Sequence, residues 1–347
     1  MAVSIGDVAK QAGVSSGTVS HVLNNNGRAR IAPATQERVR QVAAQMGYQQ
    51  NRLARSLGRQ RSDTLGLMIS GLQNPFFVHL LEAAERRAQD MGYHVMLDTA
   101  PSVGGTYHEH SKLRGWPVDG VLMWTIQRQQ AQTYLGPQAA DLPTVYLGNL
   151  GTCSGEAVMF DIAAGARQAA EHLIGGGRRR LAYLFPYPSV LLNPDSLHQG
   201  VLAEEGRYAT YVQVCREAEL SLELIIMEKP EETREAGWLT GLAIAARPAA
   251  ERPDAVLCLN DVIAQGVLFG LRRGGIRVPE DVAVVGCDGI AEGRFLETSL
   301  TTIRLDVETL CMYGLDLLSR RLAAGRGADL PPKQIIVPAA LWIGETS

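Results

Sequence analysis

The sequence predicts an N-terminal all-α helix-turn-helix head joined to an α/β body of two doubly wound parallel-sheet lobes. The first observation is a set of three short amphipathic helix patterns within residues 1–50. The second is that short apolar runs alternate with helical patterns from residue 62 onward, which is the rhythm of βαβ units. This alternation continues for about 285 residues, more than one compact sheet holds, so we expect two lobes with a ligand cleft at the carboxyl ends of their strands.

The net charge of −3 hides an uneven distribution of charge along the 347 residues. Residues 1–61 hold nine basic and two acidic residues, which gives this segment a charge of +7 and leaves −10 for residues 62–347. A basic segment on an acidic body is typical of a chain that binds a polyanion through its head. The apolar fraction of 46% is that of a chain that folds into packed domains.

Several classes of protein are disfavoured by what the sequence lacks. It has no run of about 18 apolar residues that would predict a membrane-spanning helix. It has no basic segment followed by an apolar one at the N-terminus that would predict secretion, so we expect a cytoplasmic protein. The five cysteines are scattered and never spaced as C-x-x-C, which favours buried free thiols over a disulfide framework or a metal site.

The first two helices of the head are predicted from their capping residues. The first begins after Ser4, which opens a capping box of the S-x-x-D type, and ends at Gly13. The second follows a short turn, with Ser15 or Ser16 as its cap, and a third covers residues 33–46. Two short helices joined by a three- or four-residue turn that contains Gly form the helix-turn-helix signature.

The second helix presents short polar residues on the side away from the shared core. These residues are Ser16, Gly17, Ser20, His21 and Asn24. Side chains of this kind suit the base edges in a DNA major groove, while the arginines elsewhere in the head suit phosphates. We therefore interpret the head as a DNA-binding domain. The alternative is a three-helix bundle that binds protein and whose arginines are only solvated.

Residues 51–61 are expected to form a hinge helix and a linker. Asn51 is a capping residue and Gly58 a stop, and the helix between them is shorter than the about 12 residues that an isolated helix needs in water. The segment should therefore become ordered only when it docks on another surface. Leu53 and Leu57 form one apolar edge beside two arginines. The alternative is a flexible linker with a chance pair of leucines.

The elements of the predicted body alternate along the chain. Strands are expected at 65–70, 93–98, 118–124, 144–148, 158–161, 181–185, 224–227, 255–259 and 282–286. Helices are expected at 76–91, 163–174, 204–219, 233–246 and 262–273. The run from Val282 to Val285 is apolar throughout, as expected for a parallel strand that is buried on both faces.

Polar or aromatic residues follow several of these strands. They are Asn74 to Phe77, Asp161, Asn260 to Asp261, and Asp288. Because the carboxyl ends of parallel strands meet at one edge of a sheet, we expect these residues to line the cleft. For each of them taken singly, the alternative is a helix cap or a turn residue. The repetition at four equivalent places favours a ligand site for the set.

The whole chain resembles the LacI/GalR family of bacterial transcription regulators. The head motif IGDVAKQAGVS at 5–15 and the motif LARSL at 53–57, which is similar to the hinge helix of that family, carry the resemblance. Further matching segments are 18–24, 74–77, 260–261 and 278–288. The resemblance extends from residue 4 to about residue 306, and the combination of head and hinge is highly specific.

The resemblance implies a homodimer that binds double-stranded operator DNA of pseudo-palindromic sequence, with one recognition helix of each protomer in a major groove. The implied DNA-binding residues are Ser4, Ser15, Ser16, Gly17, Thr18, Ser20, His21, Asn24, Arg28, Arg52, Arg55 and Leu57. Leu57 matches a leucine that wedges into the minor groove and unstacks one base step. Gly17 has no side chain, so part of the base readout is absent or moves to Ser16 and Ser20.

The resemblance also implies two interleaved lobes, with the chain crossing between them near residues 162, 292 and 330. It predicts a DNA-binding domain at 1–50 and an effector-binding and dimerisation domain at 62–347. Within that domain the predicted N-lobe covers about 62–162 and 292–328, and the C-lobe about 163–291 and 330–347. The implied effector-binding residues are Asn74, Phe76, Phe77, Asp161, Arg207, Asn260 and Asp288.

Departures from the family pattern leave the identity of the effector open. Gly148 and Ile162 stand where an aspartate and an asparagine are common, and residues 338–344 lack two usual arginines. Carboxylates and aromatic rings still suit a small polyhydroxyl ligand such as a sugar. Whether the ligand releases DNA or promotes its binding, and whether the oligomer is a dimer or a tetramer, also stay open.

Two other classes of function compete with an effector-controlled repressor. A solute-binding protein would have a similar body, but the basic head argues against it. An enzyme is disfavoured because the sequence has no G-x-G-x-x-G, Walker or G-x-S-x-G motif, so we expect no catalytic residues and no cofactor. His108 and His110 flank Glu109, but this spacing in a polar loop is more typical of exposed residues than of metal ligands.

Overall fold

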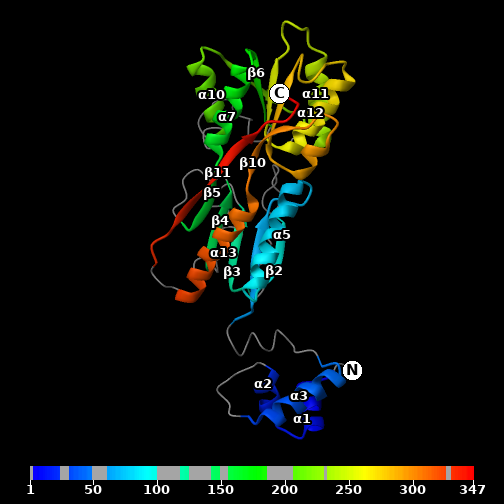
Figure 1. The fold of residues 1–347 in the computed structure, drawn as a ribbon, viewed down its shortest axis with the longest axis vertical. Coiled ribbons are helices and arrows are strands. Elements are labelled where there is room, and N and C mark those ends of the chain that lie inside the picture. Colours follow the sequence, from blue (N-terminus) through cyan, green and yellow to red (C-terminus); the bar gives the residue numbers. More distant parts are fainter. Residues whose placement is uncertain are drawn as a thin grey trace. The chain divides into compact units, whose positions relative to one another are not determined.

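The computed structural model divides the chain into two compact units, Met1–Ser62 and Asp63–Ser347 (Figure 1). The residues that the structure describes are 3–23, 31–48, 61–99, 118–124, 142–148, 155–185, 206–229, 233–325 and 330–347. The two units are called the head and the body below, and each is described by itself.

The head contains the three predicted helices, α1 (Ile5–Ala12), α2 (Ser16–Leu23) and α3 (Pro33–Gln45). One fully buried valine from each helix, Val8, Val19 and Val39, forms the centre of a small core. The capping box of α1 is present, because the Ser4 hydroxyl accepts from the backbone N–H of Asp7 and the Asp7 carboxylate accepts from that of Ser4.

The structure decides between the two predicted caps of α2. The Ser15 hydroxyl accepts from the backbone N–H of Thr18 at 3.1 Å, and α2 begins at the next residue, so Ser15 is the cap. Gly13 has a left-handed φ of 65°, which ends α1 and sets the turn between the two helices.

The body is built on a mostly parallel sheet in which the described strands take the order β2-β1-β3-β4-β5-β11-β10-β9-β8-β6-β7. The N-lobe strands are β1 (Thr64–Ile69), β2 (His94–Thr99), β3 (Gly120–Trp124), β4 (Thr144–Gly148) and β5 (Ala157–Asp161). The C-lobe strands are β6 (Leu181–Phe185), β7 (Leu222–Ile226), β8 (Ala255–Cys258), β9 (Ala283–Asp288) and β10 (Thr301–Leu305). The strand β11 (Gln334–Trp342) joins the two lobes.

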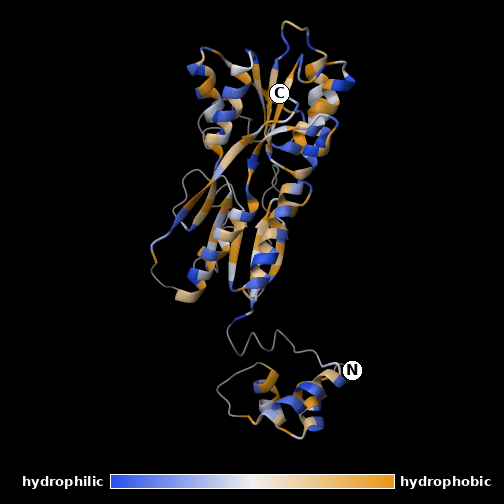
Figure 2. Ribbon diagram, in the orientation of Figure 1, coloured by the Kyte–Doolittle hydropathy of each residue, from blue (hydrophilic) through white to orange (hydrophobic). Residues whose placement is uncertain are grey.

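Helices flank the sheet in both lobes. They are α5 (Pro75–Asp90), α7 (Ile162–Gly175), α10 (Gly206–Glu217), α11 (Arg234–Ala245), α12 (Asp261–Arg273) and α13 (Val307–Ala324), with a 3₁₀ turn η2 (Ala291–Phe295). In Figure 2 the strands are mainly hydrophobic, whereas the helices carry both hydrophobic and hydrophilic residues, as the predicted alternation of buried strands and amphipathic helices requires.

The strand β11 brings the carboxyl ends of the strands in the two lobes together. Its first half runs parallel to β5, with Pro338 beside Asp161, and its second half runs antiparallel to β10, with Ala339 beside Leu305. Because one neighbour is parallel and the other antiparallel, β5 and β10 both end at the middle of β11 (the red arrow in Figure 1). The loops that follow the strands of the two lobes therefore converge there.

Two of the three predicted crossings between the lobes differ from the observed ones. The chain crosses first at Asp161–Ile162, where β5 ends and α7 begins. It does not cross near residue 292, because β10 pairs with β9 in the C-lobe and only α13 packs on the N-lobe strands. The second crossing therefore follows Leu305, and the third lies inside β11 instead of near residue 330. The alternating pattern did not predict β10 or β11 as strands.

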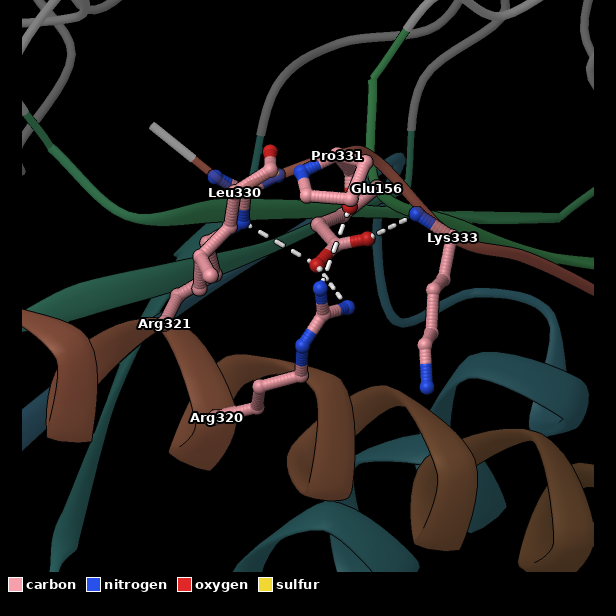
Figure 3. A network of polar contacts seen from close by, with 6 residues as sticks. All are labelled: Glu156, Arg320, Arg321, Leu330, Pro331 and Lys333. Atoms are coloured by element: carbon pink, nitrogen blue, oxygen red, sulfur yellow. Dashed lines mark hydrogen bonds and ion pairs between the residues drawn. The ribbon is translucent and has the colours of Figure 1, made fainter. Parts of the chain in front are cut away.

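A buried carboxylate fixes the end of α13 and the start of β11 (Figure 3). Glu156 is 3% exposed and accepts from Nη1 of Arg320 at 3.1 Å and from Nε of Arg321 at 3.0 Å. Its other oxygen accepts from the backbone N–H of Lys333. The same arginines donate to the carbonyl oxygens of residues 331 and 330, so one carboxylate organises the chain between α13 and β11.

We expect Glu156→Gln to lower the free energy of unfolding of the body by about 3 kcal/mol, because it leaves two partly buried guanidinium groups without their counter-charge. The control is Glu308→Gln, which removes an ion pair with Arg86 whose side chains are 59% and 64% exposed and which should cost less than about 1 kcal/mol. Urea denaturation followed by tryptophan fluorescence measures both variants. Equal losses in the two variants would contradict a structural role for the buried network.

Candidate functional site

The predicted cleft residues lie at the carboxyl edge of the sheet in both lobes. Asn74 follows β1 and is the N-cap of α5, and Asp161 is the last residue of β5 and the N-cap of α7. In the C-lobe, Asn260 follows β8 and is the N-cap of α12, and Asp288 is the last residue of β9. Asn74, Asp161 and Asn260 are therefore helix caps, as the alternative interpretation predicted. Each of these caps also lies at the edge of the sheet where the carboxyl ends of the strands meet.

A direct hydrogen bond joins the two lobes in this region. Nδ2 of Asn74 donates to Oδ2 of Asp288 at 2.8 Å, and Oδ1 of Asn74 accepts from the backbone N–H of Phe76 at 3.0 Å. Asn74 and Asp288 are each 9% exposed. The contact pairs an amide with a carboxylate in a mostly buried place, where a charge-assisted hydrogen bond is stronger than at the surface.

A cluster of aromatic rings on the N-lobe side begins two residues after Asn74, at Phe76. The ring of Phe76 lies edge-on to those of Phe77, Trp124 and Phe160, with centroid distances of 5.4, 5.2 and 6.5 Å. Phe77 and Trp124 are also in contact at 5.4 Å, and both are partly exposed. This wall of rings offers the flat apolar surface on which the C–H face of a sugar or the face of a base stacks.

The sequence reasoning missed Trp124, although it gave a signal. Trp124 is the last residue of β3, the same position in its strand that Asp161 and Asp288 hold in theirs. The structure also explains Gly148, which stands where an aspartate was expected. A Cβ at Gly148 would lie 3.1 Å from the Trp124 indole, and the residue has a left-handed φ of 114°, so the glycine makes room for the tryptophan.

Arg207 lies on the C-lobe side of the same region. Its guanidinium donates to the carbonyl oxygen of Leu259, at the carboxyl end of β8. It also lies near the thiol of Cys287, where burial raises the pKa of the thiol and the Arg207 charge partly opposes this. The arginine is therefore placed beside the ends of β8 and β9, next to Asn260 and Asp288.

Asp261, which follows Asn260, was expected to line the cleft with it, but the structure buries its side chain. Asp261 is fully buried, and its carboxylate accepts from the Thr302 hydroxyl at 2.6 Å and from the backbone N–H of Ile290 at 2.9 Å. Burial raises the pKa of Asp261 to about 7.

The head presents the predicted polar residues of α2 at its surface. Ser16, Gly17 and His21 are exposed, Ser20 is partly exposed, and the exposed Ser15 and the partly exposed Thr18 are joined by a hydroxyl–hydroxyl hydrogen bond of 2.9 Å. Ser4 is exposed at the start of α1. The remaining residues predicted to bind DNA, Asn24, Arg28, Arg52, Arg55 and Leu57, lie outside the described residues.

No helix in the described part of the chain is long and apolar enough to cross a membrane. Within the same residues, no group of His, Cys, Asp or Glu side chains could hold a metal ion.

Family models match both parts of the chain. Residues 4–51 match the model of bacterial regulatory proteins of the lacI family, and residues 170–347 match that of a periplasmic binding protein-like domain. The ribose operon repressor of Halalkalibacterium halodurans is 32% identical over 99% of this chain and 97% of its own length. The regulator CelR of Thermobifida fusca is 30% identical over 98% of this chain and 96% of its own.

Solved structures agree with these matches. A complex of the transcriptional regulator CelR with cellobiose superposes with a TM-score of 0.66 at 27% identity, covering 99% of this chain and 100% of that one. The lac repressor dimer, bound to operator and an anti-inducer, superposes with a TM-score of 0.80 at 23% identity over 100% and 99% of the two chains, which shows a shared fold. This chain thus belongs to the LacI family of bacterial regulatory proteins, with a helix-turn-helix DNA-binding head and a periplasmic binding protein-like body.

Proposed function

We propose that this protein is a transcriptional repressor whose affinity for a pseudo-palindromic operator is controlled by a sugar-like effector bound between the two lobes. The observation that carries the proposal is the Asn74–Asp288 hydrogen bond beside the wall of aromatic rings. It supplies polar groups from both lobes at one place, so a ligand there contacts both lobes at once.

The chemistry of the cleft residues favours a polyhydroxyl ligand. The Asp288 carboxylate accepts hydrogen bonds from hydroxyls, the amides of Asn74 and Asn260 both donate and accept them, and Arg207 donates to ring or hydroxyl oxygens. Phe77 and Trp124 supply a stacking surface. Relatives of this chain support a sugar: CelR was solved with cellobiose, and a LacI-family regulator from Arthrobacter sp. FB24 with lactose.

Control of DNA binding then follows from the arrangement of the lobes. A ligand that contacts both lobes favours the arrangement in which those contacts are best, and it shifts the protein toward that arrangement by its difference in affinity. The body begins at Asp63, just before β1, so a change between the N-lobes of two protomers changes the separation of their hinge segments. This account applies to release of DNA and to its retention alike, and it gives the protein a regulatory rather than a catalytic task.

The head and hinge carry out DNA recognition in this proposal. Ser16 and His21 of α2 contact base edges, Ser15 and Thr18 lie near phosphates, and Leu57 of the hinge wedges into the minor groove. The exposure of the α2 residues and the charge of +7 on residues 1–61 support this assignment. The protein acts in the cytoplasm, where it is associated with the nucleoid while it is bound to an operator.

We also propose that a homodimer forms through an apolar surface of the C-lobe. Phe295 is 85% exposed, Phe269 is 49% exposed, and Trp238 contacts Phe269 at 5.9 Å between ring centroids. Arg272 of α12 donates a hydrogen bond to the hydroxyl of Thr298, three residues after Phe295. This bond links α12, which carries Phe269, to the segment that carries Phe295. A single exposed phenylalanine is unremarkable, but a group of large apolar residues on one face favours a protein interface.

DNA binding is tested with duplexes selected from a random library by the full-length protein. We expect the wild type to bind a two-fold symmetric sequence. Its affinity for this sequence should fall steeply as the salt concentration rises, because phosphate contacts release counterions.

Leu57→Ala should weaken this binding by roughly tenfold or more and reduce the DNA bend, since the wedge is lost. Gel shift and fluorescence anisotropy measure both. The control is Leu72→Ala, an exposed leucine of the body. Unchanged affinity and bend in Leu57→Ala would contradict the hinge assignment.

The effector is sought by a thermal-shift screen of sugars and nucleobases on the full-length protein. A ligand present at about 100 times its dissociation constant stabilises the native state by about 2.7 kcal/mol and raises the melting temperature. We expect a sugar among the stabilising compounds and no stabilisation by it in Asp288→Ala. Asp316→Ala, which removes a surface partner of Arg87, is the control that keeps the response. A response retained by Asp288→Ala would rule out the cleft as the binding site.

The oligomeric state is tested by analytical ultracentrifugation. Phe295→Glu places a charge in the proposed interface and should convert a dimer into a monomer at micromolar concentration. Ile336→Glu, at a residue of β11 that is 54% exposed, is a control of the same chemistry and should remain dimeric. A Phe295→Glu protein that sediments as the wild type does would place the interface elsewhere.

A further inference from the structure

The loop between β9 and η2 carries Asp288 in an unusual backbone conformation. Asp288 has a φ of 123° and Gly289 a φ of 71°, both in the region that favours glycine. An L-residue with a side chain reaches this region only when its surroundings hold it there, and such residues cluster at functional sites. The side chain held in this way is the one that accepts from Asn74 across the lobes.

The group that holds this loop is the buried carboxylate of Asp261. Its Oδ2 accepts from the backbone N–H of Ile290 at 2.9 Å, and the N–H of Gly289 donates to the hydroxyl oxygen of Thr302 at 3.3 Å. Its Oδ1 accepts from the Thr302 hydroxyl at 2.6 Å, which fixes the carboxylate against β10. The two N–H groups that follow the strained residue are therefore held by the carboxylate, that of Ile290 directly and that of Gly289 through the Thr302 hydroxyl.

The neighbouring strand is shaped to admit this carboxylate. A Cβ at Gly286 of β9 would lie 2.1 Å from Oδ1 of Asp261, so only glycine fits there. Folding alone does not call for a carboxylate at this place, because a fully buried charge is costly and a neutral residue is often as stable. The titratable groups that interact with it are Glu292 of η2 and the thiols of Cys258 on β8 and Cys287 on β9. Asp288 and Arg207 of α10 act on the same Cys287 thiol.

We propose that Asp261 is the positioning residue of the cleft: its carboxylate holds the backbone after Asp288 so that the Asp288 side chain is presented to Asn74 and, on the function proposed above, to the effector. Asp261 itself contacts neither Asn74 nor the ligand in this assignment. It acts through the Gly289–Ile290 backbone and sets how tightly the two lobes are joined.

The proposal is tested on the full-length protein without DNA or effector. A double-mutant cycle of Asn74→Ala and Asp288→Asn, followed by urea denaturation, gives the coupling between the two side chains. All four tryptophans lie after residue 62, so their fluorescence reports on the body alone. We expect coupling in the wild-type background and its loss in Asp261→Ala. It should persist in Asp261→Asn, whose amide oxygen can accept from Ile290 and whose NH₂ can donate to Thr302. Should Asp261→Ala fail to fold, Thr302→Val, which removes the hydroxyl that orients the carboxylate, takes its place with the same expectation.

A second measurement separates this role from simple core packing. Burial raises the pKa of Asp261 to about 7, well above the about 4 of an unfolded aspartate. The native state therefore becomes less stable as the pH rises from about 4 to about 7, and Asp261→Asn should remove this loss. Amide hydrogen exchange of Gly289 and Ile290, corrected for intrinsic rates, should slow by roughly tenfold from about pH 6 to about pH 8 as the carboxylate charges, and only in the wild type.

Two results would overturn the proposal. One is coupling between Asn74 and Asp288 that survives in Asp261→Ala or in Thr302→Val. The other is exchange at Gly289 and Ile290 that has the same pH dependence in the wild type and in Asp261→Asn. Because neither measurement uses DNA or effector, a failed operator or ligand test would contradict the proposed function and leave this assignment standing, and the reverse also holds.

Discussion

The strand β11 is the constraint on which the arrangement of the body depends. It is hydrogen-bonded to β5 in one direction and to β10 in the other, and the change of partner occurs between Pro338 and Ala339. All N-lobe strands are parallel to β5, and β8, β9 and β10 are parallel to one another. The carboxyl ends of both groups therefore face the same point, and the loops that carry polar residues have to meet there.

The hydrogen bond between Asn74 and Asp288 is a single contact between the lobes, in addition to the strand pairing of β11. One hydrogen bond to a charged group contributes about 1.5–3 kcal/mol, which is within the range that a bound small molecule supplies. A ligand that replaces the Asn74–Asp288 bond with its own contacts to the two side chains can therefore change the preferred arrangement. A difference of about 1.4 kcal/mol in its affinity for two arrangements shifts their ratio tenfold. The structure thus combines a fixed hinge with a contact weak enough to be controlled.

The sequence was sufficient for the head, for most of the body and for the polar residues at the ends of strands, because these depend on local patterns. Spacing of apolar residues identified α1, α2 and α3, and the exposed face of α2 followed from the same spacing. Polar residues after apolar runs identified Asn74, Asn260 and Asp288. The Asn74–Asp288 bond itself joins residues 214 positions apart, which no local pattern reveals.

The features that sequence reasoning missed depend on distant partners. Trp124 looked like one more apolar residue at the end of a strand, and only the rings of Phe76 and Phe77 beside it show its place in the cleft. Asp261 was expected to line the cleft with Asn260, and the burial of its carboxylate was not predicted, because its partners are 29 and 41 residues away. The second crossing was predicted near residue 292, but it follows Leu305. The pairing of β10 with β9 decides that β10 belongs to the C-lobe, and no break in the sequence pattern shows this pairing.

In the function proposed above, a ligand held by Asp288 between the lobes controls the binding of operator DNA by the head. This is tested by the anisotropy of a labelled selected duplex, titrated with wild type and with Asp288→Ala, each with and without a saturating sugar found by thermal shift. We expect the sugar to change the operator affinity of the wild type by about 5–150-fold. Asp288→Ala should bind the duplex without responding to the sugar. Equal wild-type affinities with and without the sugar, or an undiminished response in Asp288→Ala, would contradict the proposed function.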